Sequence, residues 1–446
     1  MSESKSAPVA LWQQLQAVAH ALAQVRRGAS GTTALEGVPP ALRPGVQALL
    51  FQTLRHLGRA QALRAQLATR APAPLVDALL CTALALAWDS EQAPYEPHTL
   101  VNQAVEAAKK SRNLRMQANF LNACLRRFLR ERDALIQATN HDVQAHWNHP
   151  VWWVKRLQKD HPEHWQQILR TNNQAAPMTL RVNASRTSRS ALQDMWAAKG
   201  VASHPVGEQG LVLTQATHVH EIPGFSEGLC SVQDAAAQCA AQLLLKDFAP
   251  MRAGLRVLDA CAAPGGKTAH LLELLNEQSE VLALDIDPQR CERIQQNLKR
   301  IGKVATVVAA DAAQTRTWWD GQLFDAILLD APCTASGIVR RHPDVRWLRR
   351  ESDIDNLAAI QKNLLKQLWP LVKPGGRLLY CTCSVFKAEG DDQVKTFVEH
   401  NTNARLMPSL GHLRPQNETS TAELADNLPG DHDGFYYALF EKIPAP

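Results

Sequence analysis

Residues 255–287 read LRVLDACAAPGGKTAHLLELLNEQSEVLALDID, and the order of patterns in this stretch decides the fold of the C-terminal half. An apolar run at 255–260 is followed by a glycine turn, and a helical apolar pattern covers 267–277. A second apolar run then occupies 281–287. The stretch therefore predicts a strand, a turn, a helix and a second strand.

The same alternation continues downstream. We predict a helix over 288–302, strands over 304–311 and 324–332, a helix over 354–369 and a strand over 376–384. Alternation of this kind indicates an α/β domain whose parallel sheet is covered on both faces. Ligands of such sheets bind outside the carboxyl ends of the strands.

The turn after the first strand carries features of a nucleoside-binding site. Gly265 and Gly266 allow a ligand to approach the backbone, and the helix after Lys267 offers free amides. Asp285, twenty residues past Gly265, ends the next strand and is placed to accept the hydroxyls of a ribose. S-adenosylmethionine and nicotinamide cofactors share this geometry. The loop lacks the G-x-G-x-x-G spacing of dinucleotide folds, which disfavours an oxidoreductase, while a plain tight turn remains the structural alternative.

Acids and cysteines follow the later strands. Asp311 ends the run 304–311 and is placed to hydrogen-bond an adenine amino group. Asp330 ends the run 324–330, and Cys333 follows it closely. Cys383 lies at the end of the last strand, so both cysteines should face the same crevice. A single cysteine is more often a buried apolar residue than a nucleophile, but two at adjacent strand ends favour chemistry.

A thiolate beside a methyl donor suits one reaction in particular. Carbon 5 of cytosine is a poor nucleophile until a thiolate adds to carbon 6 and makes the ring enamine-like. An acid must hold the polar edge of the ring, where charge builds up. The carbon 5 proton must then leave and the thiol be expelled. Asp330 suits the role of the acid, and Cys333 is available for the release.

Cys381 and Cys383 flank Thr382, and they point to one side if the strand continues that far. They are two metal ligands, two small buried residues, or a reactive thiol with a neighbour that packs. No further ligands are evident in the sequence and there is no C-x-x-C motif, so we predict no metal site.

Several blocks together carry a resemblance to a known family. Three blocks are similar to blocks of the Sun-type RNA cytosine-C5 methyltransferases: ACAAPGGKT at 260–268, LLDAPCTASG at 328–337 and YCTCSV at 380–385. Three more blocks are similar to the same family: SVQDAAAQ at 231–238, RRHPD at 340–344 and HDGFYYALFEK at 432–442. NFLNACLRRF at 119–128 resembles the NusB-like domain of the branch that acts on small-subunit ribosomal RNA. The resemblance covers nearly the whole chain.

The resemblance implies roles for individual residues. Cys383, in the triplet Thr382-Cys383-Ser384, matches the family nucleophile, and Cys333 matches the cysteine that helps to release the product. Cys381 matches no required position and is interpreted as a packing residue. The implied contacts of the cofactor, S-adenosylmethionine, are Cys261, Ala262, Ala263, Pro264, Gly265, Gly266, Lys267, Asp285, Asp311 and Asp330.

The N-terminal part is predicted to be all-helical. Apolar stripes recur at helical spacing at Leu11–Val25, Val46–Leu57 and Leu121–Leu129. We predict three domains: a NusB-like helical RNA-binding domain at 1–145, a small α+β RNA-binding segment at 146–235 and a Rossmann-like class I methyltransferase domain at 236–446.

Basic residues gather near the end of the helical part. A solvated helix face explains such a cluster about as well as a polyanionic partner does. The arginines of 340–346 are candidates for holding phosphates near a flipped base, and the tryptophans of 152–165 are candidates for stacking, although core packing is the more common role of such tryptophans. The cluster comprises Lys109, Lys110, Arg112, Arg115, Arg126, Arg127, Arg130 and Arg132.

The composition limits the class of protein and the compartment that we expect. The 446 residues are 45% hydrophobic and 20% charged, as in ordinary folded proteins, and no apolar run reaches the length of a membrane span. Nine cysteines, an odd number, argue against a disulfide framework, and no signal peptide is evident. We expect a cytoplasmic enzyme that methylates carbon 5 of a cytidine in 16S ribosomal RNA. The alternatives are a transfer RNA substrate and a non-catalytic RNA-binding assembly factor.

Overall fold

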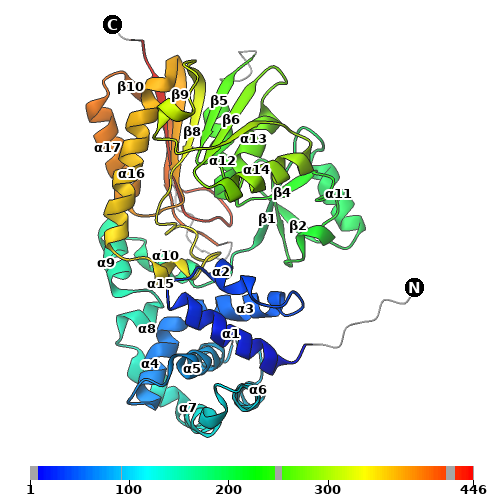
Figure 1. Ribbon diagram of the computed structural model, residues 1–446, viewed down its shortest axis with the longest axis vertical. Helices are drawn as coiled ribbons and strands as arrows, with labels where there is room; N and C mark the ends of the chain where they lie inside the picture. The colour runs from blue at the N-terminus through cyan, green and yellow to red at the C-terminus, as the bar shows by residue number, and fades with distance from the viewer. Residues whose placement is uncertain (1–8, 92, 247–253, 418–426, 445–446) are drawn as a thin grey trace. The chain divides into compact units, whose positions relative to one another are not determined.

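The computed structural model describes residues 9–91, 93–246, 254–417 and 427–444. The chain divides into two compact units (Figure 1). Unit 1 comprises 1–175 together with 339–350, and unit 2 comprises 176–338 together with 351–446. Among the described residues, no helix combines the length and the apolar character that crossing a membrane requires.

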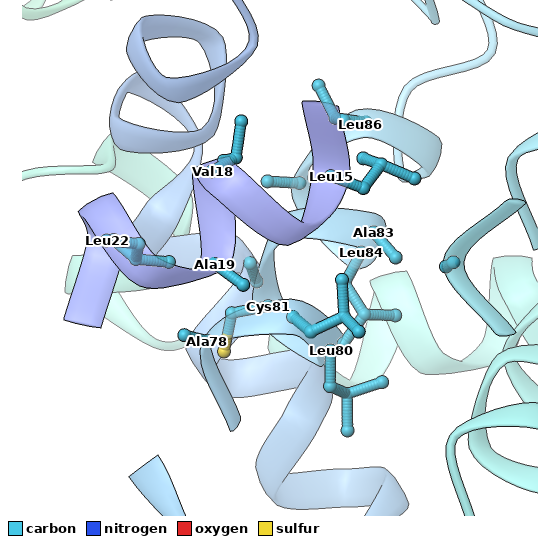
Figure 2. Close-up of a cluster of buried hydrophobic side chains, with 14 of the residues drawn as sticks. Leu15, Val18, Ala19, Leu22, Ala78, Leu80, Cys81, Ala83, Leu84 and Leu86 are labelled. Carbon is cyan, nitrogen blue, oxygen red and sulfur yellow. The ribbon is translucent and has the colours of Figure 1, made fainter. Parts of the chain in front are cut away.

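Unit 1 is built from helices, which confirms the all-α prediction. Its core lies between α1 and α5, where Leu15, Val18 and Leu22 of α1 pack against buried aliphatic residues of α5 (Figure 2). Apart from Asp77 and Thr82, helix α5 is apolar, and it is buried along nearly its whole length, as expected for a central helix. The helices are α1 (Leu11–Val25), α2 (Gly31–Glu36), α3 (Arg43–Arg55), α4 (Leu57–Leu67), α5 (Pro74–Ala87), α6 (Pro97–Lys110), α7 (Ala118–Thr139), α8 (Val143–Trp147), α9 (Val151–Asp160), α10 (Trp165–Asn172) and α15 (Val345–Leu348).

The second predicted stripe crosses two helices instead of one. Its residues are buried, but α3 ends at Arg55, and the backbone of His56 leaves helical geometry at φ −111° and ψ 15° before α4 begins at Leu57. Apolar residues three or four positions apart continue across such a kink. The periodicity therefore identified the buried face correctly and missed the break.

The segment 339–350 leaves the methyltransferase half of the sequence and belongs to unit 1. Arg346 is fully buried and donates to the backbone oxygens of Asn148 and Asn172 and to the side chain of Asn173. Burial lowers its pKa to about 9. Arg346 is thus occupied by these oxygens and is not available to a phosphate, so the prediction that it holds RNA is wrong.

We expect Arg346→Ala to lower the free energy of unfolding of unit 1 by about 3 kcal/mol, because two buried carbonyl groups lose their donor. Urea denaturation followed by far-ultraviolet circular dichroism measures the change. Arg112→Ala, on the exposed surface of the same unit, should change this energy by less than about 0.5 kcal/mol. Equal effects of the two substitutions would contradict a structural role for Arg346.

Unit 2 begins with a small antiparallel sheet in the order β2-β3-β1-β4. Trp196 of helix α11 (Arg189–Ala198) is fully buried in the core of this part, and its indole donates to the carbonyl of Pro223 at 2.8 Å. The α+β prediction for this region is confirmed. The strands are β1 (Met178–Val182), β2 (Ser203–Val206), β3 (Gly210–Leu213) and β4 (Cys230–Val232).

A seven-stranded sheet in the order β10-β11-β9-β8-β5-β6-β7 forms the rest of unit 2. Its strands are β5 (Arg256–Ala260), β6 (Glu280–Asp285), β7 (Thr306–Ala309), β8 (Phe324–Asp330), β9 (Val372–Thr382), β10 (Ala404–Leu413) and β11 (Phe435–Lys442). One face packs on α12 (Ala235–Leu245), α13 (Gly266–Leu274) and α14 (Pro288–Ile301), and the other on α16 (Ser352–Leu368) and α17 (Asp391–His400) (Figure 1). Neighbouring strand residues such as Val257 and Leu258 belong to opposite cores.

The Rossmann-like prediction is confirmed, but the sheet is mixed and not purely parallel. β7, β6, β5, β8 and β9 are parallel, whereas β11 pairs antiparallel with β9 and β10 pairs antiparallel with β11. Helix α17 is followed by a hairpin-like pair of strands, which strand–helix alternation does not predict. The antiparallel strands cover the edge beside β9, so the strand that leads to Cys383 lies inside the sheet.

Candidate active site

The glycine loop joins β5 to α13 by a tight backbone turn. Gly265 precedes the helix with φ +94°, in the left-handed region that favours glycine. A Cβ atom there would lie 3.1 Å from the Cα of Ile294 in α14, so a larger residue would press α14 away. At Gly266, the nearest atom to such a Cβ would be Gln233 Nε2 at 3.8 Å, which leaves the first helical turn open.

Asp285, the last residue of β6, is tied to this loop. The amide of Ala263 donates to its Oδ2 at 3.2 Å, and Arg290 lies 3.3 Å from its Oδ1. Arg290 also donates to the carbonyl of Ala263 at 3.1 Å. The carboxylate and the loop backbone therefore form one assembly, which places a negative charge beside the glycine turn.

Asp311 and Asp330 follow the next two strands in the chain. Asp311 lies just after β7, is half-buried, and accepts from the amide of Ala313 at 2.9 Å. Asp330 ends β8, and 27% of its side chain is exposed. The carboxylates after β6, β7 and β8 thus all lie at the carboxyl edge of the parallel strands, as the sequence predicted.

Lys267 pairs with Asp330. Its ammonium lies 2.6 Å from Asp330 Oδ2 and 5.2 Å from the centre of the Phe435 ring. Burial by itself lowers the pKa of Lys267, but Asp330 together with Cys381 and Cys383 raises it, so that the pKa stays above its usual value. Lys267 is therefore a cation that fixes the direction of the Asp330 side chain.

Cys333 and Cys383 meet, with their Sγ atoms 3.4 Å apart. Cys333 belongs to the loop after β8 and Cys383 follows β9, and these strands are neighbours in the sheet. The contact with Cys383, burial and the charge of Glu389 all raise the pKa of Cys333 well above the usual value, so Cys333 is a protonated thiol. Cys383 is the more exposed of the two.

Cys381 and Cys383 pack against the same core of the sheet, as the alternation of side chains along β9 predicts, although β9 itself ends at Thr382. The thiol of Cys381 is buried and donates to Asp330 Oδ1 at 3.5 Å, while Cys383 faces Cys333. Burial and Asp330 raise the pKa of Cys381. Within the described ranges, no group of three or more His, Cys, Asp or Glu side chains is placed to hold a metal ion.

Two buried residues that support the glycine loop were not predicted from the sequence. Asp259 accepts from the hydroxyl of Thr268 at 2.6 Å, and burial raises the pKa of Asp259 to about 7. Arg181 of β1 donates to the carbonyl of Gly266 at 3.0 Å and pairs with Glu273 at 2.7 Å. An acid inside an apolar strand was a usable signal for Asp259. An arginine in a distant strand carries no such signal.

Glu389 is the third residue that was missed, and it lies behind the two cysteines. It is fully buried in the short 3-10 helix Lys387–Glu389. Its carboxylate accepts from Thr334, next to Cys333, and from Ser384, next to Cys383. The acid lies beyond the T-C-S triplet, where neither periodicity nor spacing draws attention to it.

Three family models match this chain. The model for 16S rRNA methyltransferase RsmB/F covers 248–441, a ferredoxin-like domain of RsmF/B-like methyltransferases covers 149–220, and the NusB family covers 12–130. Along the chain, the NusB match covers the helical part, the ferredoxin-like match overlaps the small sheet and the methyltransferase match covers the large sheet.

Curated relatives match over most of their length. "Ribosomal RNA small subunit methyltransferase B" of Vibrio vulnificus is 38% identical over 96% of this chain and 98% of its own. The protein of the same name from Vibrio cholerae is 44% identical over 77% of each chain. Among solved structures, PH0851 covers 99% of this chain and 100% of its own, with a TM-score of 0.76 and 24% identity, a likeness of fold. A methyltransferase homologue from Pyrococcus horikoshii covers 67% of this chain and 97% of its own, with a TM-score of 0.56 and 26% identity.

A Rossmann-like sheet with a glycine loop after its first strand and acids after the next three defines the catalytic domain of a methyltransferase, here joined to a NusB-like helical domain and a small ferredoxin-like domain. On the strength of relatives that match nearly end to end, the chain belongs to the RsmB/F family of 16S rRNA methyltransferases.

Proposed function

We propose that this enzyme transfers a methyl group from S-adenosylmethionine to carbon 5 of a cytidine in small-subunit ribosomal RNA, in the cytoplasm. The observation that carries the proposal is the contact of Cys333 and Cys383, 3.4 Å apart at adjacent strand ends. The relatives are named for the RNA of the small ribosomal subunit, which favours this RNA over transfer RNA.

The residues around the glycine loop suit S-adenosylmethionine. The backbone at Gly266 is open to close approach, and Asp285 offers a carboxylate beside the loop for the ribose hydroxyls. Asp311, after the next strand, is partly exposed and suits the adenine amino group. We assign the cofactor to these groups and to the loop Cys261, Ala262, Ala263, Pro264, Gly265, Gly266 and Lys267, with Asp330 at the end toward the base.

When bound, the cofactor supplies an electrophilic methyl group. Cys383 forms a covalent bond to carbon 6 of the cytosine, which makes carbon 5 nucleophilic. Asp330, oriented by Lys267 and Cys381, hydrogen-bonds the polar edge of the ring, and the Lys267 ammonium beside it offsets the negative charge that develops there. In the last step the carbon 5 proton passes to solvent water, the carbon 6–sulfur bond breaks and Cys383 leaves as a thiolate. Cys333 assists this release, because its thiol lies 3.4 Å from the departing sulfur and can donate to it.

The helical part is proposed to bind the RNA. Seven of the eight clustered basic side chains are exposed, and the eighth, Arg132, donates to the carbonyl of Trp88. Glu131 neutralises part of the charge, since both Arg127 and Arg130 lie 2.9 Å from its carboxylate. We assign RNA binding to 1–145 and 146–235, and methyl transfer to 236–446.

We expect Arg112→Ala together with Arg115→Ala to weaken binding of small-subunit RNA about tenfold at moderate salt. The slope of log K against log salt should fall by about one for each phosphate that the variant no longer binds. Fluorescence anisotropy at several salt concentrations measures both quantities. Arg405→Ala, an exposed arginine of β10, serves as the control. An unchanged slope in the double variant would assign the cluster to a solvated surface.

The activity itself is tested with small-subunit and transfer RNA transcripts that carry no modification. Incubation with methyl-labelled S-adenosylmethionine, nuclease digestion and mass spectrometry of the nucleosides should yield 5-methylcytidine from the small-subunit RNA only. Sequencing of the product then identifies the position. Label in transfer RNA would show that transfer RNA is the substrate. Binding of both RNAs without any label would favour a non-catalytic assembly factor.

A further inference from the structure

Glu389 lies behind both cysteines and contacts both of their loops. Its Oε1 accepts from the amide of Thr334 at 2.8 Å, and its Oε2 accepts from the hydroxyls of Thr334 at 2.5 Å and Ser384 at 2.6 Å. Thr334 directly follows Cys333, and Ser384 directly follows Cys383. One carboxylate therefore joins the two chain segments that carry the thiols.

The surroundings hold Glu389 from several sides. Gln361 of α16 donates to its Oε1 at 3.1 Å and to the carbonyl of Pro332 at 2.9 Å. The hydroxyl of Tyr380 donates to the backbone carbonyl of Glu389 at 2.8 Å. Anchored in this way to a helix and to a central strand, the carboxylate is a rigid support for both loops.

The hydrogen bonds to Glu389 also bear on the charge of its carboxyl group. The pKa of Glu389 is raised, because burial outweighs the donors from Ser384 and Thr334, which lower it. Four donors converge on the two oxygens, which is the arrangement for an ionised carboxylate. A buried anion is costly unless it is fully hydrogen-bonded, so its presence here calls for a role, and holding the two loops is one that its contacts support.

We propose that Glu389 is a positioning residue that holds Cys333 and Cys383 next to each other, so that one thiol attacks the base and the other releases it. The two thiols belong to loops after different strands. Gly337 donates to the carbonyl of Cys383 at 2.9 Å, and the hydroxyl of Ser336 accepts from the amide of Val385 at 3.0 Å. The carboxylate adds bonds at the residues next to both thiols. This inference deepens the proposed function and rests on its assignment of the two cysteines.

Cross-linking by phenylarsine oxide tests the positioning without any methylation. The arsenical condenses with two neighbouring thiols, forming two arsenic–sulfur bonds and releasing one water, and intact-mass spectrometry follows the reaction. We expect wild-type protein to close this bridge quickly and Glu389→Ala to close it at least about tenfold more slowly. Tryptic mapping confirms that Cys333 and Cys383 are the residues joined.

The same variants are then assayed for methylation. Glu389→Ala should lower kcat about a hundredfold, as expected for a displacement of about 1 Å, and leave KM for S-adenosylmethionine within about threefold of wild type. Glu389→Gln keeps the shape and can still accept from the amide of Thr334, so it should recover part of both rates. Thr334→Val removes one hydroxyl donor and should have a smaller effect. Glu399→Ala, an exposed acid of α17, is the matched control.

The outcomes distinguish the positioning role of Glu389 from the assignment of Cys333 and Cys383 as the reacting groups. Slow bridging together with low kcat supports the positioning role. Wild-type bridging in Glu389→Ala and Thr334→Val overturns it, whatever their activity. Slow bridging with unchanged methylation would support the positioning role of Glu389 but show that Cys333 and Cys383 are not the reacting groups. In that case the assignment of the cysteines in the proposed function fails. If Glu389→Ala does not fold, Glu389→Gln and Thr334→Val decide: bridging at the wild-type rate in both overturns the proposal.

Discussion

Cys383→Ala protein is expected to lose methylation of small-subunit RNA by at least about 10⁴-fold, because carbon 5 of cytosine is not nucleophilic without the bond to carbon 6. The substitution removes one partly exposed sulfur and leaves the glycine loop and the carboxylates intact. Binding of S-adenosylmethionine should therefore remain close to wild type. Transfer of labelled methyl groups in single-turnover reactions measures the first effect, and equilibrium dialysis measures the second.

Cys239→Ala is the control for the removal of a thiol as such. Cys239 lies on α12, and its Sγ donates to the carbonyl of Ala235 in the same helix. We expect this variant to methylate at nearly the wild-type rate. Persistent methylation by Cys383→Ala would reject the assignment and make Cys333 the next candidate for the nucleophile.

Cys333→Ala protein is expected to accumulate a covalent complex with the RNA. Attack by Cys383 and methyl transfer proceed, but release slows by about 10²- to 10⁴-fold, the range that a positioned acid or base contributes. A denaturing gel with radiolabelled RNA should show a shifted band that requires S-adenosylmethionine. Because the contact with Cys383 and burial raise its pKa, Cys333 is a thiol that can donate to the departing sulfur of Cys383.

The double variant Cys333→Ala with Cys383→Ala separates this result from non-specific cross-linking. The shifted band should disappear, because the sulfur that forms the bond is absent. A band that survives in the double variant would show that another group holds the RNA. Wild-type turnover by Cys333→Ala without any band would remove Cys333 from the release step.

Much of the methyltransferase domain was predictable from the sequence. The strands before Asp285, Asp311 and Asp330 are apolar runs that end in an acid, and parallel strands bring such ends to one edge. The glycine turn and the helix after it follow from local residue types, since positive φ at Gly265 is a local requirement. The antiparallel strands β10 and β11 were not predicted, because an antiparallel edge depends on pairing partners that local patterns do not specify.

The sequence by itself determined the residue types of the chemistry: the glycine loop, the acids at successive strand ends and a cysteine after each of two strands. These signals are local, and so one pass along the chain detects them. The contact of Cys333 with Cys383, the pairing of Lys267 with Asp330 and the buried Glu389 were decided by the tertiary structure alone. Each joins segments about 50 to 60 residues apart, and only the packing of β8 beside β9 and β5 brings their side chains within hydrogen-bonding distance.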